Sequence, residues 1–167
     1  MDKVLKVAEQ FRSRDAGLVV QFIKYGISGA IATAVHIVVF SIMAWKGFPA
    51  LTERELIVRV LGVPVSPVGD ALRARNAALD NVVAFLFSNM TAYLLNILWV
   101  FHRGRHHWLI EVCLFYAVSG VAMLAGTTLQ TWLIGRLGLT TTAAFVANLV
   151  TALLINYAMR KFVIFKG

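Results

Sequence analysis

The stretch YGISGAIATAVHIVVFSIMAW, residues 25–45, decides the fold class, because it lies between Lys24 and Lys46 and contains no Asp, Glu, Lys or Arg. An α-helix needs about 20 consecutive apolar residues to cross the hydrocarbon core of a bilayer. The 21 residues of this stretch therefore predict one transmembrane helix and are too few for two.

Three further stretches without formal charge, at 81–102, 112–135 and 137–159, are 22, 24 and 23 residues long. Each predicts one more span by the same length argument. We therefore predict an all-α membrane protein, whose four-helix transmembrane domain covers residues 21–167. The predicted spans are at about 22–45, 79–101, 110–135 and 138–160, with an outer loop at 46–78 and a separate cytoplasmic segment at 1–20.

The composition also indicates a lipid environment. Hydrophobic residues make up 59% of the 167 residues and charged residues only 14%, against about 25% charged in soluble domains. The net charge of +8 points to anionic headgroups or phosphate-bearing lipids, and no basic helix or reading motif for nucleic acid is present. The single cysteine, Cys113, excludes an internal disulfide.

The distribution of basic residues predicts the orientation. With the N-terminus in the cytoplasm, ten of the sixteen Lys and Arg residues lie on the inner side and six on the outer side, so both termini are expected inside. The N-terminal segment is too polar for a cleaved leader. Val4, Ala8 and Phe11 recur at helical spacing and predict a short amphipathic helix on the membrane surface, the alternative being a frayed polar tail.

The outer loop contains a candidate helix. Thr52 and Glu55 fit a capping box, and the apolar residues at 56, 57, 60 and 61 then share one face. We expect a short interfacial helix there, followed by a helical lead from Asp70 to Leu79 into the second span. This loop would either cover a substrate from the outer side or have no functional role.

The two halves of the chain resemble each other. The pattern Tyr25-Gly26-Ile27-Ser28-Gly29 returns as Tyr116-Ala117-Val118-Ser119-Gly120, at an offset of 91. The second and fourth spans match at an offset of 60, through Ala-Phe, Thr-Ala, Leu and Asn, or at 64, through Tyr and the terminal Phe. We therefore predict two tandem helical-hairpin repeats, whose register these matches leave open by one helical turn.

Polar side chains inside the spans are candidates for contact with a headgroup. His36 is the one titratable residue predicted at mid-span. Several carboxamides accompany it: Asn89, Asn96, Gln130, Asn148 and Asn156. They would form either a polar seam for sugar hydroxyls or hydrogen bonds that hold the helices together.

Cationic residues gather at the predicted cytoplasmic edge, several of them beside aromatic residues: Lys24, Arg103, Arg105, Arg160 and Lys161. They would bind a lipid phosphate or simply follow the positive-inside bias.

His102, His106 and His107 have no acidic or thiol partner nearby in the sequence, so no metal is expected. No nucleophile with a base and no paired carboxylates are present, which predicts no enzymatic activity and no cofactor.

The chain resembles the GtrA-like family of small bacterial inner-membrane proteins. The resemblance rests on the opening Phe22-Ile23-Lys24-Tyr25-Gly26-Ile27-Ser28-Gly29, on Asn96-Ile97-Leu98-Trp99-Val100-Phe101, and on the ending Asn156 to Phe165, and it runs from about residue 20. It implies movement of polyprenyl-phosphate-linked sugars, such as undecaprenyl-phosphate glucose, across the cytoplasmic membrane for polysaccharide synthesis or modification. The family commonly has Asn-Arg-Arg where this chain has Asn96-Ile97-Leu98, so phosphate binding must rest on other residues.

Our leading hypothesis is a flippase for such a lipid, working as a homodimer because four short helices enclose little volume. The phosphate would contact Lys24, Arg103, Arg160 and Lys161, and the headgroup would contact Tyr25, His36 and the five carboxamides. The alternative is an anchor that recruits a membrane glycosyltransferase without moving lipid. A small multidrug exporter fits less well, because the first span lacks the glutamate that such proteins share.

Overall fold

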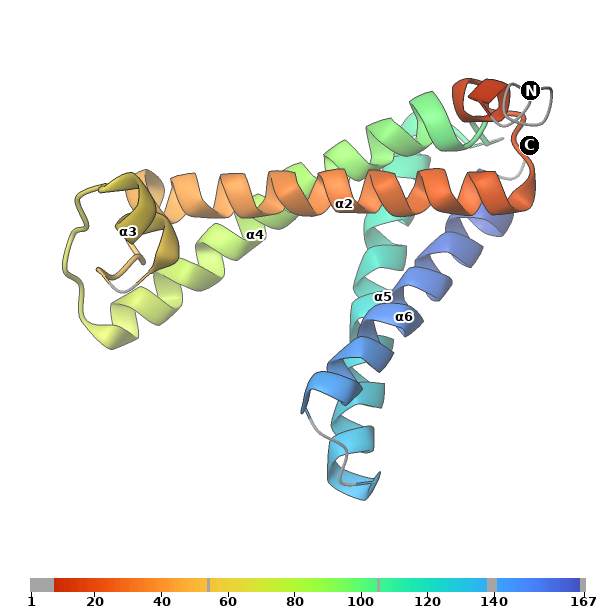
Figure 1. The fold of residues 1–167 in the computed structure, drawn as a ribbon. Coiled ribbons are helices and arrows are strands. Elements are labelled where there is room, and N and C mark those ends of the chain that lie inside the picture. Colours follow the sequence, from red (N-terminus) through yellow and green to blue (C-terminus); the bar gives the residue numbers. More distant parts are fainter. Residues whose placement is uncertain (1–7, 54, 105, 138–140, 166–167) are drawn as a thin grey trace. The chain divides into compact units, whose positions relative to one another are not determined.

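The computed structural model describes residues 8–53, 55–104, 106–137 and 141–165, and every long regular element in these ranges is helical (Figure 1). The elements in chain order are α2 (Leu18–Ile42), η1 (Met43–Gly47), α3 (Leu56–Leu61), α4 (Asp70–Leu95), η2 (Asn96–Val100), α5 (Trp108–Leu137), α6 (Thr141–Met159) and η3 (Arg160–Ile164). A helical turn at 8–12 precedes them, while Val4 of the expected amphipathic helix lies outside the described residues. The chain divides into two compact units, unit 1 (Met1–Gly26 with Leu95–Gly167) and unit 2 (Ile27–Leu94).

Three helices of the described chain are long and apolar enough to cross a bilayer: Leu18–Gly47, Ala71–Val100 and Trp108–Gly126. Only 17% of the most apolar 18-residue window of the first helix is buried within the protein, which is typical of a helix that faces lipid. These helices make the chain a multi-pass membrane protein. The fourth predicted span, at 138–160, corresponds to α6 and stays a prediction.

Unit 2 contains most of α2, then η1 and α3, and most of α4. His36 fastens α2 to α4, because its Nε2 lies 3.0 Å from Asn81 Oδ1 and its Nδ1 lies 3.3 Å from Ser88 Oγ. The buried apolar residues of unit 2 include the small Ala32 on α2, Ala44 on η1 and Ala84 on α4. Small side chains allow helix backbones to approach closely, as is common inside membranes.

The segment at 46–78 forms the short helix α3, but the N-cap of this helix differs from the predicted one. Glu55, not Thr52, is the N-cap residue of α3, and no side chain caps this end; Thr52 instead donates to the carboxylate of Glu55 at 3.4 Å. Of the α3 side chains that the structure describes, Val58 is buried, whereas Val60 and Leu61 are exposed. The helical lead into the second span is confirmed, because α4 begins at Asp70.

Unit 1 contains the start of α2, then η2, α5, α6 and η3. Helices α5 and α6 pack side by side, and η3 packs on α5 (Figure 1). Both η2 and η3 are π-helical turns with the same ending, in which Phe101 N donates to Asn96 O at 2.7 Å and Phe165 N donates to Arg160 O at 2.8 Å. These matching ends follow the 64-residue offset and not the offset of 60.

Candidate functional site

Six aromatic rings, which we call the aromatic cluster, form the centre of unit 1. Phe101 and Phe165, one from each matching helix end, stack with centroids 5.3 Å apart and an interplanar angle of 16°. Tyr157 lies 5.3 Å from Tyr25 and 6.1 Å from Phe101, measured between ring centroids. The members are Phe22, Tyr25, Phe101, Phe115, Tyr157 and Phe165. Aromatic packing of this kind fixes ring positions to a degree that plain aliphatic contacts do not.

The guanidinium of Arg160 is buried against this cluster, with only 6% of the residue exposed. Its Nη1 donates to Tyr25 Oη at 3.0 Å and its Nη2 donates to Ser119 Oγ at 2.9 Å. The guanidinium carbon lies 3.6 Å from the centroid of the Phe115 ring. Arg160 of η3 is therefore contacted by one group from the start of α2, Tyr25, and by two groups from α5, Ser119 and Phe115.

Arg160 has no carboxylate partner in the part of the chain that the structure describes. Among these residues its Nε has no hydrogen-bond partner, and no carboxylate forms an ion pair with its side chain. A guanidinium stays charged in proteins, and burying a charge without an opposite charge is unfavourable even when an aromatic ring contributes a cation–π interaction. The arrangement is therefore suited to an anion, and a phosphate oxygen matches guanidinium geometry well.

Lys24 is also fully buried in unit 1, but it is held differently. Its Nζ donates to Ser13 O at 2.7 Å and lies 5.2 Å from the centroid of the Trp99 indole. Trp99 Nε1 in turn donates to Phe11 O at 2.7 Å, and Arg14 Nη1 donates to Ile97 O at 3.1 Å. The segment before α2 is thereby held against η2, with Arg14 donating from the segment and Trp99 donating from η2.

The other two predicted phosphate residues lie in different surroundings. Lys161 is half-buried and donates to Tyr157 Oη at 3.3 Å, so Tyr157 connects it to the aromatic cluster. Arg103 is exposed and forms no hydrogen bond or ion pair with any residue that the structure describes. Arg160, Tyr25 and Lys161 are thus brought together around the cluster, and Arg103 is not.

The repeat explains how the two buried cations are related. At the offset of 91, Lys24 on α2 corresponds to Phe115 on α5, and at the offset of 64, Asn96 on η2 corresponds to Arg160 on η3. One hairpin therefore places its cation on the first helix and a carboxamide on the terminal turn. The other hairpin places an aromatic ring on the first helix and its cation on the terminal turn.

The carboxamides and His36 are held in different ways, and the polar seam stays a prediction. His36 is bound to Asn81 and Ser88, which matches the alternative of a histidine held by a neighbouring helix. Asn156 Nδ2 donates to Ala152 O of its own helix at 2.9 Å. Asn89 and Asn96 are both buried but belong to different units, and the side chains of Gln130 and Asn148 lie outside those described.

Several residues of the site were not expected from the sequence. Ser119 was noted only as part of the repeated Tyr-Ser-Gly pattern, and Phe115 looked like an ordinary apolar residue. Glu111 directly precedes the charge-free stretch 112–135, where a charge is expected beside water, yet it is 1% exposed and its Oε1 accepts from Gly104 N at 2.9 Å. Gly104 packs so closely that an added Cβ would collide with the carbonyl oxygen of Ile164.

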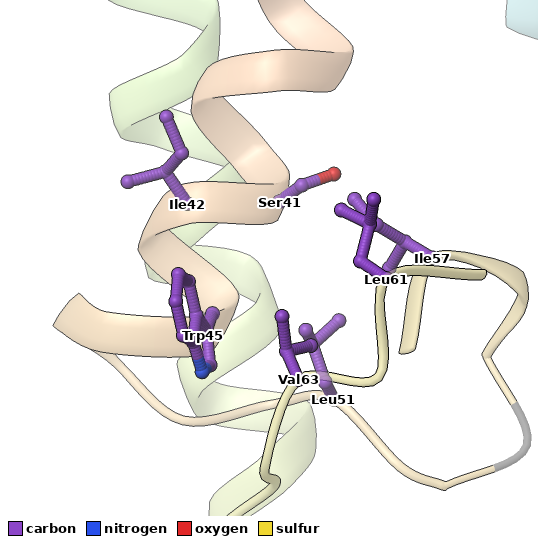
Figure 2. A pocket seen from close by; sticks show the side chains of 7 residues that line it. All are labelled: Ser41, Ile42, Trp45, Leu51, Ile57, Leu61 and Val63. Carbon is purple, nitrogen blue, oxygen red and sulfur yellow. The ribbon is translucent and has the colours of Figure 1, made fainter. Parts of the chain in front are cut away.

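Unit 2 has its own pockets around the segment at 46–78. An apolar pocket of about 130 Å³ lies between the end of α2, η1 and α3, with Trp45, Leu61 and Val63 among its walls (Figure 2). Trp45 Nε1 donates to Pro64 O at 3.1 Å, which holds the returning segment against η1. A second pocket of about 280 Å³ is lined by polar groups that include Glu53 and Arg73. Leu51 lines both pockets.

Apolar helices long enough to cross a bilayer, together with a buried arginine that has no carboxylate partner among the described residues, define a helical membrane protein with a candidate anion site. The chain belongs to the GtrA/DPMS transmembrane domain family, whose model matches residues 71–165, more than half of the 167 residues. The GtrA-like resemblance is thereby confirmed. No curated protein and no solved structure matches the chain significantly.

Proposed function

We propose that this protein translocates a polyprenyl-phosphate-linked sugar, or its carrier lipid, across the bacterial cytoplasmic membrane without chemical change. The observation that carries the proposal is the buried Arg160 guanidinium, which has hydrogen-bond donors to spare and no carboxylate partner among the described residues. A lipid phosphate would supply the missing charge and accept the remaining N–H groups.

The surroundings of Arg160 suit a lipid better than a free anion. The aromatic cluster presents apolar faces beside the guanidinium, so a phosphate held there can leave its hydrocarbon chain in the bilayer. Lys161, half-buried and bonded to Tyr157, supplies a second cation at the same end of α6. Membership of the GtrA/DPMS family supports the same class of substrate.

The finer assignments belong to this proposal. Both termini lie in the cytoplasm, α6 is the fourth span, and two copies of the chain assemble so that enough volume is enclosed for a headgroup. The apolar rows that face away from the described core, such as Val121 and Leu124 on α5, are available to the second copy and to lipid. A membrane glycosyltransferase would supply or use the transported lipid.

A transport assay tests the proposal. Purified protein is reconstituted into liposomes that contain a fluorescent polyprenyl-phosphate sugar, and the headgroups that reach the opposite leaflet are counted by membrane-impermeant quenching. We expect the wild type to transport the lipid and Arg160→Gln to lose most of this transport. The control Arg103→Gln removes the same positive charge from an exposed arginine, and it should transport like the wild type.

The competing function makes the opposite prediction. An anchor that only recruits a glycosyltransferase would move no headgroup above the level of protein-free vesicles, for any of several polyprenyl-phosphate sugars, while still co-purifying with that enzyme. That result would overturn the proposed transport.

A further inference from the structure

Asp80, on α4 in unit 2, is a buried acid that the proposed function does not use. None of its surface is exposed, and neither carboxylate oxygen has a hydrogen-bond partner among the described residues. On the same face of α4, one turn away in each direction, lie Asn76 and Ala84, which are also buried. The amide of Asn76 is already donated to Pro49 O at 2.8 Å, so it does not serve Asp80.

Asp80 lies near the start of the predicted second span, at 79–101, where a charge is expected beside water. In the structure it lies within the helix Ala71–Val100 and is completely buried. The next residue, Asn81, bonds to His36, which lies in the middle of the apolar stretch of α2. Asp80 therefore lies on a part of α4 that is beside the apolar stretch of α2, and not beside the chain that follows Lys46.

The charged and titratable side chains of the surrounding elements do not neutralise Asp80. His36 on α2 is held by Asn81 and Ser88, and Lys46 on η1 lies over the ring of Trp45 at 4.1 Å from its centroid. The remaining described ones are Glu53, Glu55 and Arg59 around α3, and Arg73 and Arg75 on α4. Among the described residues, none of these forms an ion pair or a hydrogen bond with Asp80.

We propose that Asp80 is a proton-binding site, occupied in the conformation described and emptied when α2 and α4 separate enough to admit water. An ionised carboxylate without donors in an apolar helix pair is strongly disfavoured, whereas a protonated one loses the charge and most of that cost. The reaction is simple proton transfer, in which water on one side of the membrane gives a proton to the Asp80 oxygen and water on the other side accepts it.

Coupling to transport rests on the proposed function. If the lipid moves only when unit 2 rearranges, then binding and release of a proton at Asp80 would tie each cycle to the pH difference across the membrane. The pH difference would then supply energy for transport. The sequence did not indicate this energy source, because it predicted His36 as the only titratable residue at mid-span.

Infrared spectroscopy of the purified protein tests the site without any substrate. We expect the wild type at neutral pH to show the carbonyl stretch of a protonated carboxylic acid, which Asp80→Asn removes. The matched control Asp15→Asn, at an acid whose side chain is 83% exposed and bonded to His102, should retain the band. Absence of the band from the wild type at neutral pH, or its persistence in Asp80→Asn, would overturn the proposal.

A stability measurement provides a second test. Because a neutral site tolerates an apolar residue of similar volume, Asp80→Leu should unfold in detergent at the same temperature as the wild type or higher. A large loss of thermal stability in Asp80→Leu would contradict a protonated, unpaired side chain.

The coupling is tested separately in liposomes with an imposed pH gradient. Wild-type transport should change with the gradient, by up to about tenfold per pH unit for one proton per cycle, and transport by Asp80→Asn should not respond. An equal rate of wild-type transport with and without the pH gradient would refute the coupling. A wild type that moves no lipid at all would refute the proposed function, and the infrared result would still decide the proton site.

Discussion

Arg160 and Phe115 meet face to face inside unit 1, with the guanidinium carbon 3.6 Å from the ring centroid. The two residues come from the terminal turn η3 and from α5, and their counterparts in the first hairpin are Asn96 and Lys24. Each hairpin thus has one buried cation. In the first hairpin it lies on the first helix, and in the second hairpin it lies on the terminal turn. This asymmetry creates one arginine whose hydrogen bonds reach only neutral hydroxyl groups within the described chain.

Removing the hydroxyl of Tyr25 should weaken the Arg160 site. In Tyr25→Phe the guanidinium loses its 3.0 Å acceptor, and leaving a buried charged donor unsatisfied costs about 1–3 kcal/mol. We expect a lower unfolding temperature in detergent and slower transport. The comparison variant is Tyr116→Phe, at the equivalent position of the second repeat, whose hydroxyl is not an acceptor of Arg160. Transport should fall less in Tyr116→Phe than in Tyr25→Phe. Equal effects of both substitutions would show that the Tyr25 hydroxyl has no special role.

The sequence predicted the helices well because charges cannot lie at depth without a cost, so charge-free stretches of about 20 residues mark candidate spans directly. It also named Arg160, Tyr25 and Lys161 as candidate site residues, on the grounds of position and resemblance. It could not identify Phe115 or Ser119, because an apolar and a small residue inside a span look the same whether they face lipid or a guanidinium.

The burial of the charged residues beside the predicted spans could not be predicted from the sequence. Lys24, Asp80 and Glu111 were placed at the ends of spans, and all three are almost completely buried. A charge count along the chain locates such residues only along the membrane normal, whereas burial depends on which helix face they occupy. The role of the carboxamides stays a prediction, since Asn156 Nδ2 donates within its own helix while its buried Oδ1 has no hydrogen-bond partner among the described residues.

Gly104 should not tolerate a side chain. A methyl group in Gly104→Ala would collide with the Ile164 carbonyl and lie 3.2 Å from Glu111 Oε1, which are backbone and buried atoms with little room to move. We expect a large fall in the yield of folded protein, measured by monodisperse elution in detergent. The control Gly120→Ala, where nothing lies within 4 Å of the added Cβ, should be neutral or slightly stabilising. Normal folding of Gly104→Ala would contradict the close packing of η3 on this loop.

Trp99 should control the attachment of the N-terminal segment. Trp99→Phe removes the 2.7 Å hydrogen bond to Phe11 O and weakens the aromatic contact of Lys24. We expect faster amide hydrogen exchange at residues 8–14 and unchanged exchange in α5. Trp132→Phe, at a half-exposed residue of α5, serves as the control, and no difference between the two variants would argue against the fastening described here.

His36 should act as a structural residue and not as a headgroup contact. His36→Leu leaves Asn81 and Ser88 without their cross-helix partner, which should lower stability by about 1 kcal/mol for each lost bond. Transport per folded protein should remain. Loss of transport at unchanged thermal stability would instead assign His36 to the substrate path.

The most direct measurement of the central claim is binding of a short-chain polyprenyl phosphate to the purified protein in detergent, followed by the change in tryptophan fluorescence. The account predicts that the wild type and Arg103→Gln bind with similar affinity. Arg160→Gln should bind at least about tenfold more weakly, corresponding to about 1.4 kcal/mol, and Arg160→Lys should recover only part of the affinity because it cannot bind bidentately. Equal affinity in the wild type and a correctly folded Arg160→Gln would contradict the claim that Arg160 holds the lipid phosphate.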